Sequence, residues 1–162
     1  MSKSAATQNV ISLAASDAGR MAKLHSDAFP ADEAWDHLQF EELMRQDNVI
    51  CRAILQEDFL ACAMLVQIAA DQAEILTVAT AQSNRRIGLA EALLHHVELE
   101  LFARGLKKWL LDVAADNSAA IAFYQKNGFS EDGHRRGYYK RLAGNRVDAI
   151  LMSKLMARQG VA

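Results

Sequence analysis

The stretch SNRRIGLAEALL, residues 83–94, carries the most information about the fold of this chain. Two arginines, Arg85 and Arg86, run into Gly88, and the apolar pattern becomes helical from about Arg86 onward. A helix start exposes free backbone N–H groups and the positive end of the helix dipole, and a glycine there lets an anion approach the backbone. The pattern therefore predicts a phosphate-binding turn, although a glycine kept for packing beside two solvated arginines fits the same letters. Neither G-x-G-x-x-G nor G-K-S/T occurs in the chain, which excludes a dinucleotide fingerprint and a Walker A loop.

The composition is that of one compact, soluble globular domain. The chain has 162 residues, of which 51% are hydrophobic and 23% are charged, with a formal net charge of -2. Such a chain is long enough to bury a substantial core. A dedicated nucleic-acid-binding protein is usually basic, so the charge balance argues against that class.

The cysteines and histidines predict neither a disulfide nor a metal site. Cys51 and Cys62 lie within apolar runs, which favours buried thiols in a reducing compartment. The neighbours His95 and His96 would point to different sides of a helix, and no Cys-x-x-Cys or His-Glu-x-x-His motif is present. No apolar run is long enough to span a membrane, and the first residues lack the apolar core of a signal peptide. We therefore expect a cytoplasmic protein without membrane association, either a monomer or a homodimer.

Hydrophobic periodicity predicts a single α/β (α+β) domain over residues 9–157, after a flexible N-terminal segment of residues 1–8. Strands are predicted at 10–15, 49–55, 59–69, 73–80 and 107–115, from Phe129 onward, and at 148–156. Helices are predicted from Asp17 to Ala28, from Asp32 through Trp35 to Met44, from about Arg86 to a cap at Gly105, and from Asn117 to Gly128. The order β-α-α-β-β-β-α-β-α-β-β favours a mixed, mostly antiparallel sheet flanked by helices.

A carboxylate, an amide and a phenol follow one another in the stretch LLDVAADNSAAIAFYQKNGF, residues 110–129. Asp112 stands inside an otherwise apolar strand, where a buried carboxylate costs free energy unless it has a partner. Asn117 is placed to cap the next helix, and Tyr124 lies on that helix. Each also has an ordinary structural interpretation, as a strand-end carboxylate, a helix cap and a core aromatic ring.

These motifs, in this order and spacing, resemble the GNAT superfamily of N-acetyltransferases. Arg85-x-x-Gly88-x-Ala90 matches the acetyl-CoA motif Gln/Arg-x-x-Gly-x-Gly/Ala, and NSAAIAFYQKNGF, which begins at Asn117, matches the segment that carries the family's Asn and Tyr. RRGYY (135–139) followed by DAILM (148–152) is similar to the RimI branch, the ribosomal-protein alanine N-acetyltransferases.

The resemblance implies an enzyme that transfers an acetyl group directly from acetyl-CoA, its cosubstrate, to a primary amine, with no metal. The residues implied to bind acetyl-CoA are Val78, Ala79, Thr80, Arg85, Arg86, Ile87, Gly88, Leu89, Ala90, Glu91 and Asn117. Asp112 falls where RimI-type enzymes carry a glutamate base, and Tyr124 falls where they carry the tyrosine acid. The acceptor groove is implied to be lined by Phe29 of the AFP sequence (28–30) and by Arg135, Arg136, Tyr138 and Tyr139.

Several alternatives stay open at the level of sequence. Asp112 is one methylene shorter than glutamate, so the base is either Asp112, directly or through a water, or another carboxylate such as Glu74. The leading acceptor is a protein N-terminal α-amine, as in the alanine of ribosomal protein S18, and a small-molecule amine or a lysine side chain is the alternative. A non-catalytic acyl-CoA sensor or partner subunit would keep the same fold. An acetyltransferase acting on aminoacyl-tRNA is a further alternative, against which the net charge argues.

Overall fold

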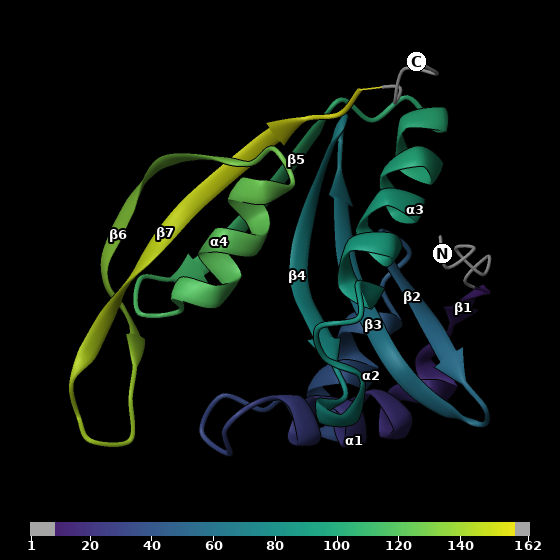
Figure 1. Cartoon of the computed structure of the whole chain (residues 1–162), viewed down its shortest axis with the longest axis horizontal. Helices are drawn as coiled ribbons and strands as arrows, with labels where there is room; N and C mark the ends of the chain where they lie inside the picture. Colours follow the sequence, from purple (N-terminus) through teal and green to yellow (C-terminus); the bar gives the residue numbers. More distant parts are fainter. Residues whose placement is uncertain (1–8, 158–162) are drawn as a thin grey trace, which may run out of the picture. The chain divides into compact units, whose positions relative to one another are not determined.

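The computed structural model describes residues 9–157 (Figure 1). The strands are β1 (Val10–Leu13), β2 (Val49–Gln56), β3 (Phe59–Ala69), β4 (Gln72–Thr80), β5 (Lys108–Ala114), β6 (Ser130–Lys140) and β7 (Arg146–Leu155). The α-helices are α1 (Ala18–Ala28), α2 (His37–Met44), α3 (Leu89–Ala103) and α4 (Ser118–Lys126), with short 3-10 helices η1 (Ala15–Asp17) and η2 (Gln82–Asn84). The flexible segment predicted for residues 1–8 lies outside the described residues.

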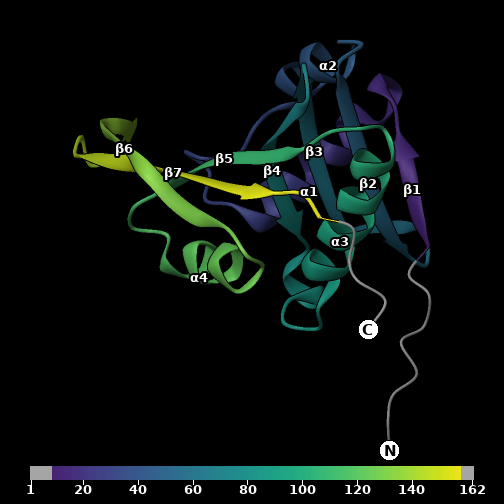
Figure 2. The ribbon, with the colours of Figure 1, turned by 90° about the horizontal axis from the view of Figure 1, so that it is seen from above.

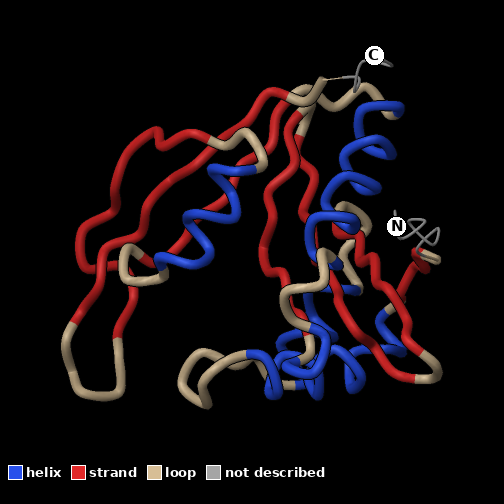
Figure 3. Tube along the Cα trace, viewed as in Figure 1, coloured by secondary structure: helices blue, strands red, loops and turns tan. Residues whose placement is uncertain are grey.

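The strands form one sheet of seven in the order β1-β2-β3-β4-β5-β7-β6. Figure 3 shows the strands in red and the helices in blue along the trace. Strands β4 and β5 are parallel and are joined through α3, as a parallel pair requires a crossover connection. The pairs β1–β2, β5–β7 and β6–β7 are antiparallel. The predicted α/β class, the mixed sheet and the predicted order of elements are confirmed.

The chain divides into two compact units. The first unit comprises the residues up to Leu65 together with Thr77–Val97. The second comprises Val66–Leu76 and the residues from Glu98 onward. The predicted cofactor loop therefore falls in the first unit, and the predicted acid and base fall in the second.

Helix α1 of the first unit has the predicted bounds. It ends because Phe29 is extended (φ -123°, ψ 153°), as the residue before a proline prefers to be. Its buried face carries Met21, Leu24 and His25. Helices α1 and α2 pack against each other, so this face belongs to the core of the first unit.

The predicted start of the second helix at Asp32 is wrong, since α2 begins at His37. Asp36 is the N-cap, and its Oδ1 accepts a hydrogen bond from the Gln39 backbone N–H at 2.9 Å. Gln39 Oε1 accepts one in return from the Asp36 backbone N–H, also at 2.9 Å. This reciprocal capping box decides the helix start, and Trp35 consequently lies outside the helix.

Strand β5 of the second unit is buried on one face only. Trp109, Leu111 and Val113 are buried, whereas the alternate residues, including Asp112, are half-buried. The predicted strand is confirmed, and its alternating burial leaves the face that carries Asp112 partly open to solvent. Helix α4 lies beside β6 and β7 (Figure 2), and its Tyr124 ring meets the Phe129 ring edge-on, with 5.4 Å between the ring centroids.

A largely buried ion pair joins α3 to β7 within the second unit. Lys154 Nζ lies 2.8 Å from Glu98 Oε2, and the Glu98 side chain is 3% exposed. A carboxylate so far from water requires such a partner. The pair therefore accounts for a charged residue in the otherwise apolar stripe of α3.

The two cysteines are buried free thiols, as predicted. Burial raises the pKa of Cys51 to about 12 and that of Cys62 to about 11. Both thiols are therefore protonated, unreactive members of the core at neutral pH.

Candidate active site

The predicted anion-binding turn is a loop of four residues, Arg85–Gly88, between η2 and α3. Arg86 (φ 61°) and Gly88 (φ 84°) both have left-handed backbone conformations, so α3 begins at Leu89, three residues later than the sequence pattern predicts. A Cβ added at Gly88 would meet nothing within 4 Å. The space beside Gly88 is open, and a ligand can approach the backbone at this helix start.

The arginines of this loop differ in their surroundings. Arg85 Nη2 donates a hydrogen bond of 2.6 Å to the Ala28 carbonyl at the end of α1. Asp27 strengthens the same junction, since its Oδ2 accepts from the Gln82 backbone N–H at 2.9 Å. Arg86 is exposed. Arg85 thus fixes the loop to α1, while Arg86 is free to meet an anion.

The end of β4 holds the residues predicted to meet the pantetheine arm. Ala79 is buried, and Val78 and Thr80 are half-buried. Thr80 Oγ1 lies 3.4 Å from Cys62 Sγ, which fixes the Thr80 side chain against β3. The predicted contact with the pantetheine arm is made by the backbone groups of these three residues.

The first unit also contains a buried histidine, His25, whose role the sequence pattern does not indicate. Its Nε2 lies 2.9 Å from Thr77 Oγ1, and its Nδ1 accepts a hydrogen bond from the Trp35 backbone N–H at 3.0 Å. The Phe29 ring stacks on the imidazole, with 4.2 Å between the ring centroids. Desolvation by burial lowers the pKa of His25 to about 4. The predicted acceptor residue Phe29 is therefore held by a neutral histidine anchored to β4.

The second unit brings two carboxylates together on one face of its sheet. Glu74 of β4 pairs with Leu110 of β5, so Glu74 shares a face with Asp112, two residues further along β5. Burial, and then the negative charge of Asp112, raise the pKa of Glu74. Arg135 of β6 lies on the same face, with its Nη1 3.9 Å from Asp112 Oδ2. Glu74, the alternative base, is thus a neighbour of the predicted base.

Two phenols complete this group. Tyr139 is half-buried, and burial, followed by the charge of Asp112, raises its pKa to about 12. Tyr124 is buried, and burial, followed by Tyr139, raises its pKa well above the usual range. Tyr124 is therefore protonated at neutral pH and can act only as a proton donor.

The tyrosine doublet of β6 presents two ring faces. The Tyr138 and Tyr139 rings are perpendicular, at 87°, with 5.0 Å between the ring centroids. Tyr138 is 52% exposed, and the Arg135 guanidinium lies 5.4 Å above its ring centroid. Arg136 is exposed. The structure therefore brings together Asp112, Tyr124, Arg135 and the doublet in the second unit.

Asn117 caps α4, as predicted. Its Oδ1 accepts a hydrogen bond from the Ala120 backbone N–H at 3.1 Å. The residue is exposed. Its contact with the cofactor stays a prediction.

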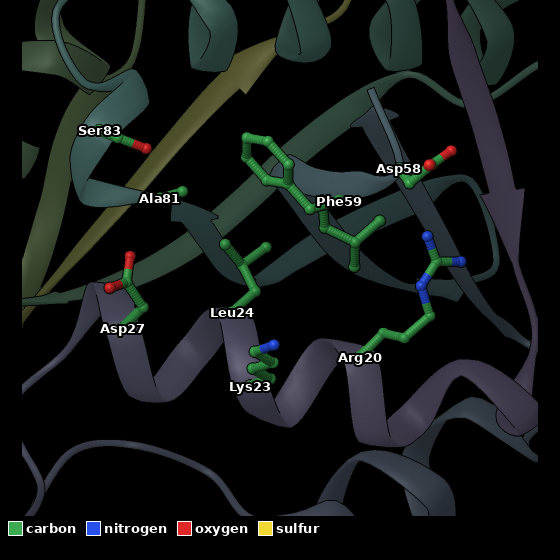
Figure 4. Close-up of a pocket in the computed structure, with 9 residues that line it drawn as sticks. Arg20, Lys23, Leu24, Asp27, Asp58, Phe59, Ala81 and Ser83 are labelled. Atoms are coloured by element: carbon green, nitrogen blue, oxygen red, sulfur yellow. The ribbon is translucent and has the colours of Figure 1, made fainter. Parts of the chain in front are cut away.

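The first unit contains a cavity of about 370 Å³ (Figure 4), and none of the predicted cofactor-binding residues is among its lining residues. It lies between α1, the β2–β3 turn and η2, and it is lined by Arg20, Lys23, Leu24, Asp27, Asp58, Phe59, Leu60, Ala81 and Ser83. Two cations and two carboxylates balance in this lining, so the cavity offers a polyanion such as CoA no net attraction. The open turn at Gly88 therefore stays the predicted place of the cofactor.

Between residues 9 and 157 no helix is both long and apolar enough to cross a membrane. Within the same range, no three or more His, Cys, Asp or Glu side chains are grouped so that they could hold a metal ion.

Comparison with known proteins identifies the class to which this chain belongs. A model described as the Acetyltransferase (GNAT) family matches residues 18–129. The chain belongs to this family. Its members use acetyl-CoA as the acetyl donor, and the chain is therefore an acyltransferase.

Individual relatives are more specific. The chain is 39% identical over 100 residues to the [ribosomal protein bS18]-alanine N-acetyltransferase of Escherichia coli K12, which covers 62% of this chain and 67% of the relative. It is 32% identical over 146 residues to the N-alpha-acetyltransferase RimI of Mycobacterium tuberculosis, covering 88% and 89% of the two chains.

Solved structures show the same fold. The crystal structure of the ribosomal-protein-S18-alanine N-acetyltransferase from Escherichia coli matches with a TM-score of 0.84 and 30% identity, covering 95% of this chain and 97% of that one. Arabidopsis thaliana NAA60 in complex with a bisubstrate analogue matches with a TM-score of 0.79 at 19% identity, covering 91% and 97%. The second match supports the fold alone.

Proposed function

We propose that this enzyme acetylates the α-amino group of a protein N-terminus, with an N-terminal alanine of a ribosomal protein as the leading acceptor. The observation that carries the proposal is the 39% identity to the [ribosomal protein bS18]-alanine N-acetyltransferase. The N-alpha-acetyltransferase RimI, similar over 88% of this chain, supports the same class of acceptor. A ribosomal-protein acceptor places the reaction in the cytoplasm.

The acceptor is a protonated ammonium at neutral pH, and it must lose a proton before its nitrogen can attack the acetyl carbonyl. Asp112 is the proposed base, and Glu74 is its neighbour and the alternative base. Arg135, 3.9 Å from Asp112, keeps a positive charge beside the carboxylate. The carboxylate pair also attracts the cationic amine to this face of the sheet.

Tyr124 is the proposed acid. As the new C–N bond forms and the C–S bond breaks, the departing sulfur needs a proton, and the buried phenol of Tyr124 supplies it. The ammonium gives its first proton to the carboxylate before attack, and the carboxylate later returns that proton to solvent. The nitrogen loses a second proton as the amide forms, and this proton restores the phenol of Tyr124. No covalent enzyme intermediate is required, so the two buried cysteines have no part in the step.

The fit to acetyl-CoA rests on the helix start. The residues proposed to bind its pyrophosphate are Arg85, Arg86, Ile87, Gly88, Leu89, Ala90 and Glu91. The open backbone at Gly88 and the exposed Arg86 suit a pyrophosphate. Val78, Ala79 and Thr80 are proposed to meet the pantetheine arm through their backbone, and Asn117 is proposed to contact the cofactor through its amide nitrogen. When bound, acetyl-CoA supplies the activated acetyl thioester.

The residues proposed to bind the acceptor are Phe29, Arg135, Arg136, Tyr138 and Tyr139. Aromatic walls and cations suit an extended peptide, because rings pack on its apolar side chains and cations bind its carbonyl groups. Binding to nucleic acid is not part of the proposal, and a monomer or a homodimer is compatible with it.

Mass spectrometry tests the proposal directly. Purified enzyme is incubated with acetyl-CoA and a peptide that has an N-terminal alanine and one internal lysine. We expect a single acetyl group on the α-amine, located by fragmentation. A peptide blocked at its N-terminus is the control and should remain unmodified. Acetylation of the lysine would show a side-chain acetyltransferase, and binding of CoA without transfer to any amine would show a sensor.

A further inference from the structure

Strand β6 carries an insertion at the tyrosine doublet. Arg135 pairs with Ala149 of β7, and the next pair in register is Tyr139 with Val147. Three residues of β6, Arg136 to Tyr138, therefore stand opposite the single residue Asp148. Bulges of this kind often occur beside active sites, where they redirect a side chain.

Two side chains of β7 hold this bulge from both sides of Gly137. Asp148 Oδ1 accepts a hydrogen bond of 2.8 Å from the Gly137 backbone N–H. Arg146 Nη1 donates one of 3.1 Å to the Gly137 carbonyl. Gly137 has a φ of 56°, a conformation that residues with a Cβ rarely adopt. The backbone N–H and the carbonyl of Gly137 are thus both hydrogen-bonded to side chains of β7, in place of the backbone partners of a regular strand pair.

The bulge brings the two tyrosine rings together. Tyr139 pairs with Val147, so it lies on the face that carries Arg135 and, through β5, Asp112. Neighbouring side chains of a regular strand point to opposite faces of the sheet, yet the ring centroids of Tyr138 and Tyr139 are 5.0 Å apart. The contact between the rings therefore depends on the irregular backbone of the bulge, and Tyr138 within it is 52% exposed.

We infer that Asp148, with Arg146, is a positioning residue for acceptor binding: it holds the Gly137 bulge so that Tyr138 and Tyr139 form two walls of the acceptor site. The inference rests on the proposed function, since it assigns these tyrosines to the acceptor. In this inference Asp148 acts through the bulge and does not itself bind either reactant. Its backbone carbonyl also accepts from the Ala115 N–H at 2.9 Å, which ties the bulge to the end of β5.

The test measures how the bulge affects each substrate separately. Asp148→Ala removes the acceptor of the Gly137 N–H, and the bulge that positions both tyrosines loses a hydrogen bond to a charged group. We therefore expect the KM for the N-terminal alanine peptide to rise about tenfold or more. We expect kcat to change little and the Kd for CoA to stay the same. Asp148→Asn keeps a side-chain oxygen at the same place and should restore most of the peptide affinity. Asp132→Ala, at an exposed aspartate on β6 outside the bulge, is the matched control.

A second variant keeps the test decisive if Asp148→Ala fails to fold. Gly137→Ala strains the same bulge through its positive φ and should raise the peptide KM in the same way. A folded Asp148→Ala or Gly137→Ala enzyme with the parent's peptide KM would overturn the positioning role and leave the proposed function standing. A parent enzyme that transfers acetyl to no N-terminal peptide would overturn both.

Discussion

The Nε2 atom of His25 on α1 lies 2.9 Å from the Oγ1 atom of Thr77 on β4, and both side chains are buried. The other ring nitrogen accepts a hydrogen bond from the Trp35 backbone N–H, so His25 is neutral, with its proton on Nε2. One imidazole thereby connects the segment after α1 to the strand that leads into the cofactor loop. A protonated ring would donate from both nitrogens, and the bond from Trp35 would be lost.

Acid should therefore destabilise the protein through His25. Its pKa falls from 6.5 to about 4 on folding, so the unfolded state binds a proton below pH 6.5 while the native state does not. The stabilisation is complete above pH 6.5 and is lost as the pH falls towards 4, by about 3 kcal/mol in total. Urea unfolding between pH 7.5 and 4.5 measures this dependence. The slope should shrink in His25→Gln and persist in His96→Gln, where the exposed ring is replaced. An unchanged slope in His25→Gln would contradict the assignment.

Gly88→Val should abolish CoA binding with only a moderate loss of stability. A valine at φ 84° is strained, and its side chain would occupy the open space at the start of α3. Gly105→Val is the matched control, because Gly105 beyond the other end of α3 has a φ of 90° and an equally open surround. Isothermal titration with CoA should show a loss for Gly88→Val alone. Equal affinity in both variants would place the pyrophosphate elsewhere.

Asp112→Asn should lower kcat/KM at pH 7 by about 10² or more, which is the usual contribution of a general base. The rate should recover at high pH, where the free amine is abundant and needs no base. Glu74→Gln should have the smaller effect if Asp112 is the base. Full pH–rate profiles of both variants decide between them. The opposite ranking would assign the base to Glu74, whose raised pKa already favours proton uptake.

Tyr124→Phe should reduce kcat strongly while leaving the Kd for CoA and the melting temperature almost unchanged. The substitution removes only the hydroxyl, and the ring keeps its edge-on contacts with Phe123 and Phe129. Stopped-flow kinetics at saturating acetyl-CoA and peptide would measure the chemical step. A rate equal to that of the parent enzyme would remove Tyr124 from the acid role.

The elements that could be predicted from sequence are those with local signals. Asn117 caps α4 through its own side chain, and Pro30 ends α1 by restricting Phe29. The start of α2 was missed because Asp32 and Asp36 are both good caps. Asp36 prevails because Gln39, three residues on, returns its hydrogen bond.

The parts of the site that depend on strand register could not be predicted in this way. The sequence contains Gly137 and Asp148, but only the pairing of β6 with β7 places them together. His25 was missed for a similar reason, because its partner Thr77 is 52 residues away along the chain. A local sequence pattern does not show contacts between residues that lie so far apart along the chain.

The burial of the two cysteines has a practical consequence for following this reaction. Each turnover releases free coenzyme A, whose thiol is exposed and reacts readily with a colorimetric thiol reagent. Cys51 and Cys62, with pKa values near 12 and 11, are closed to the same reagent while the protein is folded. The absorbance of the reagent in a continuous assay will therefore measure released coenzyme A alone. At elevated temperature, a slow second increase in absorbance will show that unfolding has exposed the two cysteines.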